Sequence, residues 1–147
     1  MTRLLILLAT LLPTLVFAAE AKLPEDGRVL VKMPPLQQTL MRQDMVEHLS
    51  ALHAVLGLMA EGKLDQAAEL AEKALGVSSM GKHAAATGGQ GPGRYMPEAM
   101  RGIGVGMHQA ASEFARVAKQ GDRAAAYRAL EPVTAACAAC HNGFRIR

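Results

Sequence analysis

Apolar residues recur along the first half of the chain at steps of three and four residues. Between residues 36 and 61 they fall at positions 41, 45, 49, 52, 56 and 59. This spacing puts them on one face of a long helix, and Gly62 is the residue type that commonly follows a helix end. A second helix is predicted from Asp65, which can cap its start, to Leu75, before Gly76.

Residues 77–95 break this pattern. They contain the run Gly88-Gly89-Gln90-Gly91-Pro92-Gly93, a composition typical of a loop. A connection of this length is uncommon in a compact domain. We therefore expect it to contain a short turn of its own or to cover a ligand.

Helical spacing resumes at Pro97 and continues to Gly121. The apolar positions are Met100, Ile103, Met107, Ala111, Phe114 and Ala118. Within this stretch Gly102, Gly104 and Gly106 should each cost about 1 kcal/mol of helix stability relative to alanine. They predict close packing between helices or a local distortion of the helix, and contact with a flat ligand is the further alternative.

The last segment, residues 122–144, has a helical composition that Pro132 interrupts. Proline at this position either kinks one helix or begins a second one at Glu131-Pro132. Together the four helical patterns, with short turns at 62–64 and 119–122, predict an all-α fold, an antiparallel four-helix bundle.

Composition agrees with a single helical domain and excludes two classes of protein. The chain has 147 residues, few aromatic residues (3%), nine methionines and a formal net charge of +3. No dense basic patch interleaved with aromatic residues is present, so nucleic-acid binding is not expected. The only two cysteines are too close together in the sequence to staple a fold, which excludes a disulfide framework.

The N-terminus has the pattern of a secretory signal peptide. Arg3 precedes an almost wholly apolar run over residues 4–17, and Ala18-Ala19-Glu20-Ala21 offers small residues for cleavage after Ala18 or Ala21. The run is shorter than the roughly 20 residues that span a bilayer, so no membrane span is expected after cleavage. We divide the chain into a signal peptide (1–21), an extended N-terminal lead-in (22–35) and a four-helix domain (36–147), and expect a periplasmic location.

The motif Cys137-Ala138-Ala139-Cys140-His141 is C-x-x-C-H, the attachment signature of c-type haem. On a helix, positions i, i+3 and i+4 lie within about 100° of one another. Both thiols and the imidazole therefore leave from one face. We expect Cys137 and Cys140 to bind one haem c covalently and His141 to ligate its iron from the proximal side.

Two other readings of the cysteine pair are weaker. A redox-active C-x-x-C is expected at a helix start within a βαβ unit, and the sequence shows no strand pattern. A structural zinc site would need two further ligands, for which His83 or His108 could be nominated only arbitrarily.

The C-terminal sequence resembles that of the class II c-type cytochromes, the cytochrome c′ family and its low-spin relatives. These proteins carry C-x-x-C-H-x-x-[FY]-[RK] on the last helix of a four-helix bundle, which here corresponds to Cys137 through Arg145. The first helix is also similar, with Met41-Arg42-Gln43 where members often have an aromatic residue followed by Arg-Gln, and with Gly62-Lys63 at its end. The resemblance covers roughly residues 36–147, and the Gly-rich loop and the helical glycines depart from it.

The resemblance implies that the distal residue near the iron lies on the first helix. It is apolar in the five-coordinate members, and a methionine thioether in the low-spin ones. A gap-free register from Arg42 puts Val46 at this position, with Met45 beside it. Met45 is our candidate distal ligand, followed by Met41 and His48, whereas filling of the core is the other role for the two methionines.

Phe144 and Arg145 complete the candidate site. Phe144 continues the apolar stripe of the last helix and should pack against haem or core. By resemblance Arg145 would contact a haem propionate; the other reading is a solvated charge at the chain end.

Three functions follow, in order of preference. The first is a periplasmic monohaem electron carrier that works with unidentified redox partner proteins and is not an enzyme. The second is a five-coordinate protein that binds nitric oxide or carbon monoxide. The third is a haem-free periplasmic metal-binding protein that uses the Met and His residues of 80–108, which leaves the C-x-x-C-H motif unexplained. Related proteins often form homodimers, so a homodimer is also a candidate assembly.

Overall fold

The computed structural model describes residues 25–147. The predicted signal peptide, residues 1–21, lies outside the described residues. Within the described range no helix combines the length and the apolar character needed to cross a membrane.

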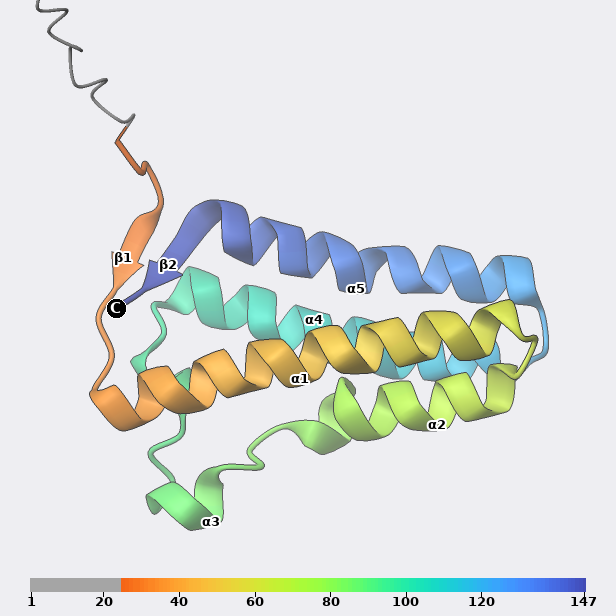
Figure 1. The fold of residues 1–147 in the computed structure, drawn as a ribbon, viewed down its shortest axis with the longest axis horizontal. Coiled ribbons are helices and arrows are strands. Elements are labelled where there is room, and N and C mark those ends of the chain that lie inside the picture. The colour runs from red at the N-terminus through yellow and green to blue at the C-terminus, as the bar shows by residue number, and fades with distance from the viewer. Residues whose placement is uncertain (1–24) are drawn as a thin grey trace, which may run out of the picture.

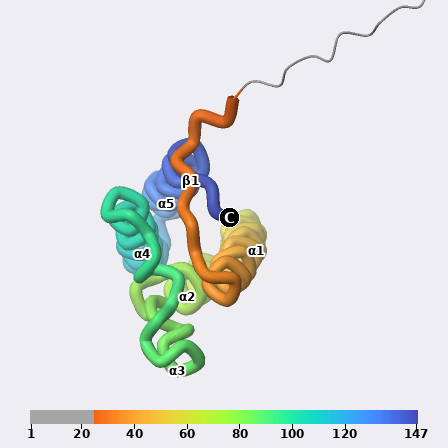
Figure 2. The backbone as a smooth tube through the Cα atoms, turned by 90° about the vertical axis from the view of Figure 1, so that its left-hand side faces the viewer, coloured from red at the N-terminus to blue at the C-terminus, as the bar shows by residue number. Residues whose placement is uncertain are grey.

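Four long helices form the body of the protein. They are α1 (Pro35–Ala60), α2 (Leu64–Ala74), α4 (Glu98–Ala118) and α5 (Arg123–Gly143). Each runs antiparallel to the one before it, and the end-on view shows them arranged around a common axis (Figure 1, Figure 2). The predicted all-α four-helix bundle is confirmed, with a small two-stranded sheet added to it.

The helix ends follow local chemistry. The Asp122 carboxylate accepts a hydrogen bond from the Ala125 backbone N–H at 3.0 Å, which caps the start of α5. Gly62 (φ 76°) and Gly121 (φ 81°) adopt the left-handed conformation in the turns after α1 and α4. Asp65 does not cap α2 as predicted: Lys63 occupies the N-cap position, and Asp65 lies in the first turn, where its charge complements the helix dipole.

Pro132 lies inside α5 and does not begin a new helix. The two outcomes that the sequence left open are therefore resolved in favour of one continuous helix. Its side chain is exposed. This continuity matters for the site, because α5 extends through the whole C-x-x-C-H motif.

The main core lies toward the end of the bundle where α1 turns into α2 and α4 into α5. Its largest fully buried side chains are Phe114, Met59, Val55 and Val133, and many of its other members are alanines. Helix α1 packs on α2, and both α2 and α5 pack on α4. In contrast, α1 and α5 make few direct contacts with each other.

A second, methionine-rich cluster lies at the opposite end of the bundle. It consists of Val31, Met33, Met41 and Met100. Here the residues before α1 form β1 (Val29–Val31), which pairs in parallel with β2 (Phe144–Ile146) directly after α5. The described part of the predicted lead-in thus contains a strand that the sequence pattern did not predict.

The connection between α2 and α4, residues 77–95, contains the short helices η1 (Val77–Ser79), α3 (Ala84–Thr87) and η2 (Pro92–Tyr95). The expectation that it holds turns of its own is confirmed, and α3 projects from the bundle (Figure 1). We call residues 77–95 the crossover segment.

Polar contacts tie the crossover segment to α1. The buried Gln37 side chain donates to the Gln90 carbonyl at 2.9 Å. The Asp44 carboxylate pairs with Lys82 Nζ at 2.7 Å and with His83 Nε2 at 2.8 Å. The segment is therefore held over the first half of α1.

Replacing Phe114 by alanine should destabilise the bundle by about 3–5 kcal/mol, because the ring is fully buried among small side chains that cannot refill its volume. Urea unfolding followed by circular dichroism measures the loss. Tyr127→Ala is the matched control, since Tyr127 is 44% exposed and its removal should change the free energy of unfolding far less. Equal losses for the two variants would contradict the assigned core.

Candidate functional site

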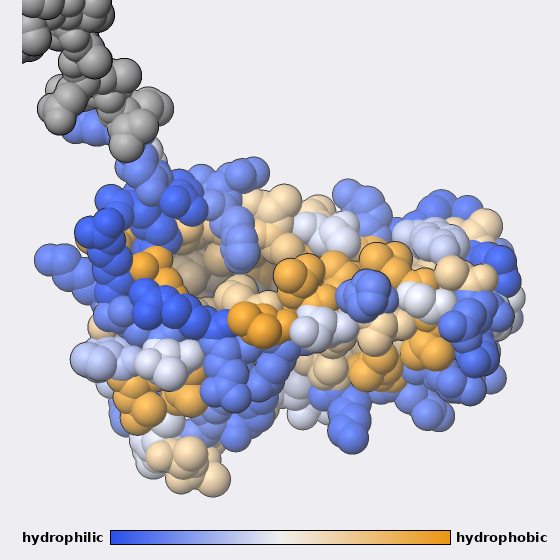
Figure 3. Space-filling view, in the orientation of Figure 1, coloured by the Kyte–Doolittle hydropathy of each residue, from blue (hydrophilic) through white to orange (hydrophobic). Residues whose placement is uncertain are grey.

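An apolar cavity of about 740 Å³ lies where α1 and α5 are separated. Its volume is in the range of ligand-binding pockets, roughly 300–1,000 Å³. Figure 3 shows the surface hollowed between these two helices, near the end that carries the C-terminus. Most of its lining side chains are apolar and come from three helices: Met41, Met45, Val46, Leu49 and Leu52 from α1, Met100, Ile103 and Met107 from α4, and Val133, Ala136 and Cys140 from α5. We call it the haem-motif cavity.

The C-x-x-C-H motif lines this cavity. Cys137, Cys140 and His141 lie in the last part of α5, and all three side chains contribute to the wall. Cys140 is half-buried, whereas Cys137 and His141 are exposed. The helical spacing therefore brings the predicted attachment residues to one face that opens onto one cavity.

Burial raises the pKa of both thiols, and the neighbouring Cys137 further raises the pKa of Cys140. The motif also lies at the C-terminal end of its helix, where the dipole disfavours negative charge. Redox-active C-x-x-C pairs have the opposite setting, a helix N-terminus that lowers the thiol pKa. These thiols are thus poor candidates for dithiol exchange.

The α1 wall holds the candidates for the distal side. Met41, Met45, Val46 and His48 all line the haem-motif cavity. Met41 is buried in the methionine-rich cluster, while Met45 is half-buried and packs against that cluster, as does Cys140. Val46 is 67% exposed. Met45 thus combines a thioether that opens onto the cavity with a position near the attachment residues.

Three charged residues lie at the strand end of this cavity. The Asp26 carboxylate pairs with Arg28 at 2.8 Å and with Arg145 Nε at 3.3 Å. A side-chain hydrogen bond from Arg28, with a weaker contribution from Arg145, holds the pKa of Asp26 well below its usual range. Arg28 also donates to the His141 carbonyl at 3.5 Å.

Both arginines line the haem-motif cavity. Arg145 was predicted from the sequence to lie at the site, whereas Arg28, the second arginine there, was not. Arg28 lies far from the motif in the chain, and only the pairing of β1 with β2 brings it to the site. Two guanidinium groups at one rim can bind carboxylates in a bidentate manner.

Phe144 also lines the cavity and packs against the methionine-rich cluster. It is the first residue of β2 and is half-buried. The expected packing against the core is therefore observed, and the residue also borders the cavity.

The helical glycines of α4 border open space. An added Cβ at Gly102, Gly104 or Gly106 would meet no atom within 4 Å, so the explanation by close packing between helices is wrong. Gly104 also lines the haem-motif cavity. Its missing side chain leaves room for a flat group beside the helix.

No group of three or more His, Cys, Asp or Glu side chains within residues 25–147 is arranged to hold a metal ion. Of the histidines that the sequence analysis left aside, His108 lines the haem-motif cavity, and His83 does not. The apolar pattern gave no signal for His108, because its neighbour Met107 points about 100° away from it on the helix.

Comparison with known proteins supports this reading of the C-terminal part. Residues 96–145, which include α4, α5 and the complete C-x-x-C-H motif, match the family model described as Cytochrome C′. A match to this family implies binding of haem c. Searches of curated proteins and of solved structures found no significant match.

The raised thiol pKa predicts slow alkylation of the haem-free protein near neutral pH. The rate of reaction with iodoacetamide, followed by mass spectrometry, rises with pH as the thiols ionise. The pH at which this rate is half its maximum should be higher in the folded protein than in the same protein unfolded in urea. The reason is that burial disfavours the thiolate only in the folded state. A midpoint at or below that of the unfolded protein would contradict the assigned environment.

Proposed function

We propose that this chain, whose residues 96–145 match the Cytochrome C′ family model, is an exported monohaem c-type cytochrome that carries electrons in the periplasm. The observation that carries the proposal is the convergence of two thiols and one imidazole on a single apolar cavity. Export rests on the sequence pattern of residues 1–21. Its redox partners are proteins that remain to be identified, and no catalytic role is proposed, since electron transfer needs no general acid or base.

The residues present fit a covalently bound haem. The cavity has the volume and the apolar lining that a porphyrin needs, and Gly104 leaves space beside α4. The rim offers Arg28 and Arg145 as cationic partners for two propionates. Guanidinium groups suit this task because they recognise carboxylates in a bidentate manner.

Each residue of the motif has a distinct task. The thiols of Cys137 and Cys140 would each add across one vinyl group, forming a thioether with no atom lost. The imidazole of His141 would ligate the iron as proximal ligand. When bound, haem c supplies a one-electron couple between ferric and ferrous iron.

The remaining walls would set the redox properties. Apolar side chains from α1 and α4 exclude water and lower the local dielectric constant, which is one of the ways in which a protein tunes a haem potential. Met45 would provide a thioether as sixth ligand, a choice that raises the potential in other c-type cytochromes. Met41, buried in its cluster, would serve packing.

Val46 supports a second candidate function. It is the position that the family register assigns to the distal side, and it lines the haem-motif cavity. An apolar side chain there would leave the iron five-coordinate, and the protein would then bind nitric oxide or carbon monoxide instead of carrying electrons.

The attachment residues can be tested by maturation. When the full chain is coexpressed with haem maturation proteins, it should carry one covalent haem, seen as a mass increase after denaturation and as a pyridine haemochrome spectrum. The variant Cys137→Ala with Cys140→Ala should lose covalent haem completely, because no thiol remains. Absence of covalent haem in the unaltered protein would overturn the proposal.

The distal ligand can be tested by spectroscopy. If Met45 is the sixth ligand, Met45→Ala should convert a low-spin spectrum to a high-spin one and allow rapid binding of carbon monoxide. Met80→Ala is the matched control, since Met80 does not line the haem-motif cavity, and it should leave the haem spectrum unchanged. Rapid carbon monoxide binding by the unaltered protein would favour the five-coordinate alternative.

A further inference from the structure

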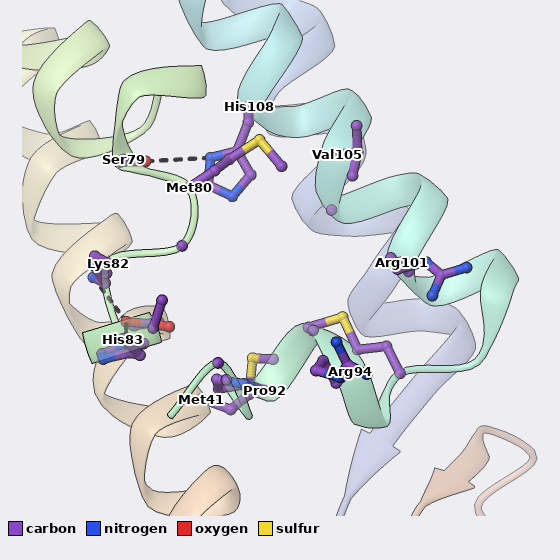
Figure 4. Close-up of a pocket in the computed structure, with 18 of the residues that line it drawn as sticks. Met41, Ser79, Met80, Lys82, His83, Pro92, Arg94, Arg101, Val105 and His108 are labelled. Carbon is purple, nitrogen blue, oxygen red and sulfur yellow. Dashed lines mark hydrogen bonds and ion pairs between the residues drawn. The ribbon is translucent and has the colours of Figure 1, made fainter. Parts of the chain in front are cut away.

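A second cavity, of about 590 Å³, lies beneath the crossover segment (Figure 4). It adjoins the haem-motif cavity and shares part of its wall, including His48 and His108. Its own residues include Met80 and His83 of the crossover segment. The C-x-x-C-H motif does not line this cavity, and the proposed haem function gives no role to Met80 or His83, which line this cavity and not the other.

Two imidazoles from different helices meet at this wall. His48 on α1 and His108 on α4 are half-buried, with ring centres 5.9 Å apart and ring planes at 86°. A metal about 2.0 Å from a ligating nitrogen lies roughly 3.2 Å from that ring's centre, so two rings that bind one metal can have centres up to about 6.4 Å apart. The observed spacing falls within this limit.

The hydrogen bonds of His108 leave one nitrogen ready to ligate. Its Nδ1 lies 2.7 Å from the Leu75 carbonyl oxygen. Because a carbonyl can only accept, Nδ1 carries a proton, and in the neutral ring the free lone pair is therefore on Nε2. A weaker contact from the same nitrogen to Ser79 Oγ, at 3.3 Å, is drawn in Figure 4. Orientation of one ring nitrogen by a backbone carbonyl is the usual setting of a metal-binding histidine.

Thioethers decide which metal fits. Met41, Met80 and Met96 line the same cavity, and thioether ligands select Cu(I) among the common metals. Zinc prefers Cys, His, Asp and Glu, and residues 25–147 contain no suitable group of three such side chains. Met80 is the thioether that belongs to this cavity alone, whereas Met41 and Met96 also line its neighbour.

We propose that His48, His108 and Met80 form a Cu(I) site, separate from the haem motif, beneath the crossover segment. The two imidazoles come from α1 and α4, and the crossover segment supplies the thioether. Its polar contacts with α1, from Lys82 and His83 to Asp44, hold the segment over the site.

The test uses the full-length mature protein with both thiols blocked, either by thioether bonds to haem or by alkylation, so that cysteine cannot bind copper. Anaerobic titration against the Cu(I) chelator bicinchoninate should show one Cu(I) per chain. His48→Gln, His108→Gln and Met80→Leu should each weaken binding by at least about tenfold, as expected for loss of a ligand. His53→Gln is the matched control, because His53 is exposed on α1 and lines neither cavity, and it should bind copper like the unaltered protein.

X-ray absorption of the Cu(I) protein provides a measurement that does not depend on variants. It should show both nitrogen and sulfur scatterers around copper. Absence of stoichiometric binding, equal binding by all variants, or a spectrum without nitrogen ligands would overturn the proposal. So would variants that alter the haem spectrum while copper binding stays unchanged, since these histidines would then belong to the iron.

Discussion

The separation of α1 from α5 is the constraint on which the site depends. Helices α1 and α5 pack through α2 and α4 and hardly touch each other. Toward the α1–α2 turn the large side chains of Phe114 and Met59 fill the interior. Toward the other end no side chain within residues 25–147 fills the space between α1 and α5 in this way; methionine, leucine and valine side chains and Gly104 line a cavity instead.

The strand pair closes this open end. Its parallel register joins the residues before α1 to the residues after α5, from Val29 with Phe144 to Val31 with Ile146. Backbone hydrogen bonds between Met33 and Arg147 and between Arg147 and Val31 extend the pairing. The motif on α5 is thereby held against α1 by the chain ends, although the two helices themselves do not pack. The same pairing brings Arg28 beside Arg145, so the cationic rim of the cavity is a consequence of the fold.

The sequence predicted those parts of the protein that depend on local spacing. Helical periodicity identified α1, α2, α4 and α5, and the i, i+3, i+4 spacing placed Cys137, Cys140 and His141 on one face. The strands were missed because three residues are too few to show a period and their partners lie at opposite ends of the chain. Asp65 was misjudged as a cap because the choice between adjacent N-terminal positions depends on backbone geometry. The sequence also could not tell whether Met45 or Val46 faces the proposed iron site. Adjacent helical residues differ by about 100° in direction, so the answer depends on how α1 packs and not on the spacing of its apolar residues.

The many methionines within residues 25–147 lie in the two core clusters and along the two cavities. Methionine fills irregular volume without branching and also offers a soft sulfur ligand. Exposure separates these roles here. Met41, Met59 and Met100 are buried, whereas Met45 and Met80 line a cavity and keep more of their surface accessible. The two cavities also share His48, His108 and Gly104. A group bound on one side of this common wall therefore borders the other side. Because the proposed haem is covalent, the equilibrium that can be linked to copper binding is reduction of the iron: if reduction changes the copper affinity, copper binding must change the reduction potential to the same extent in free energy.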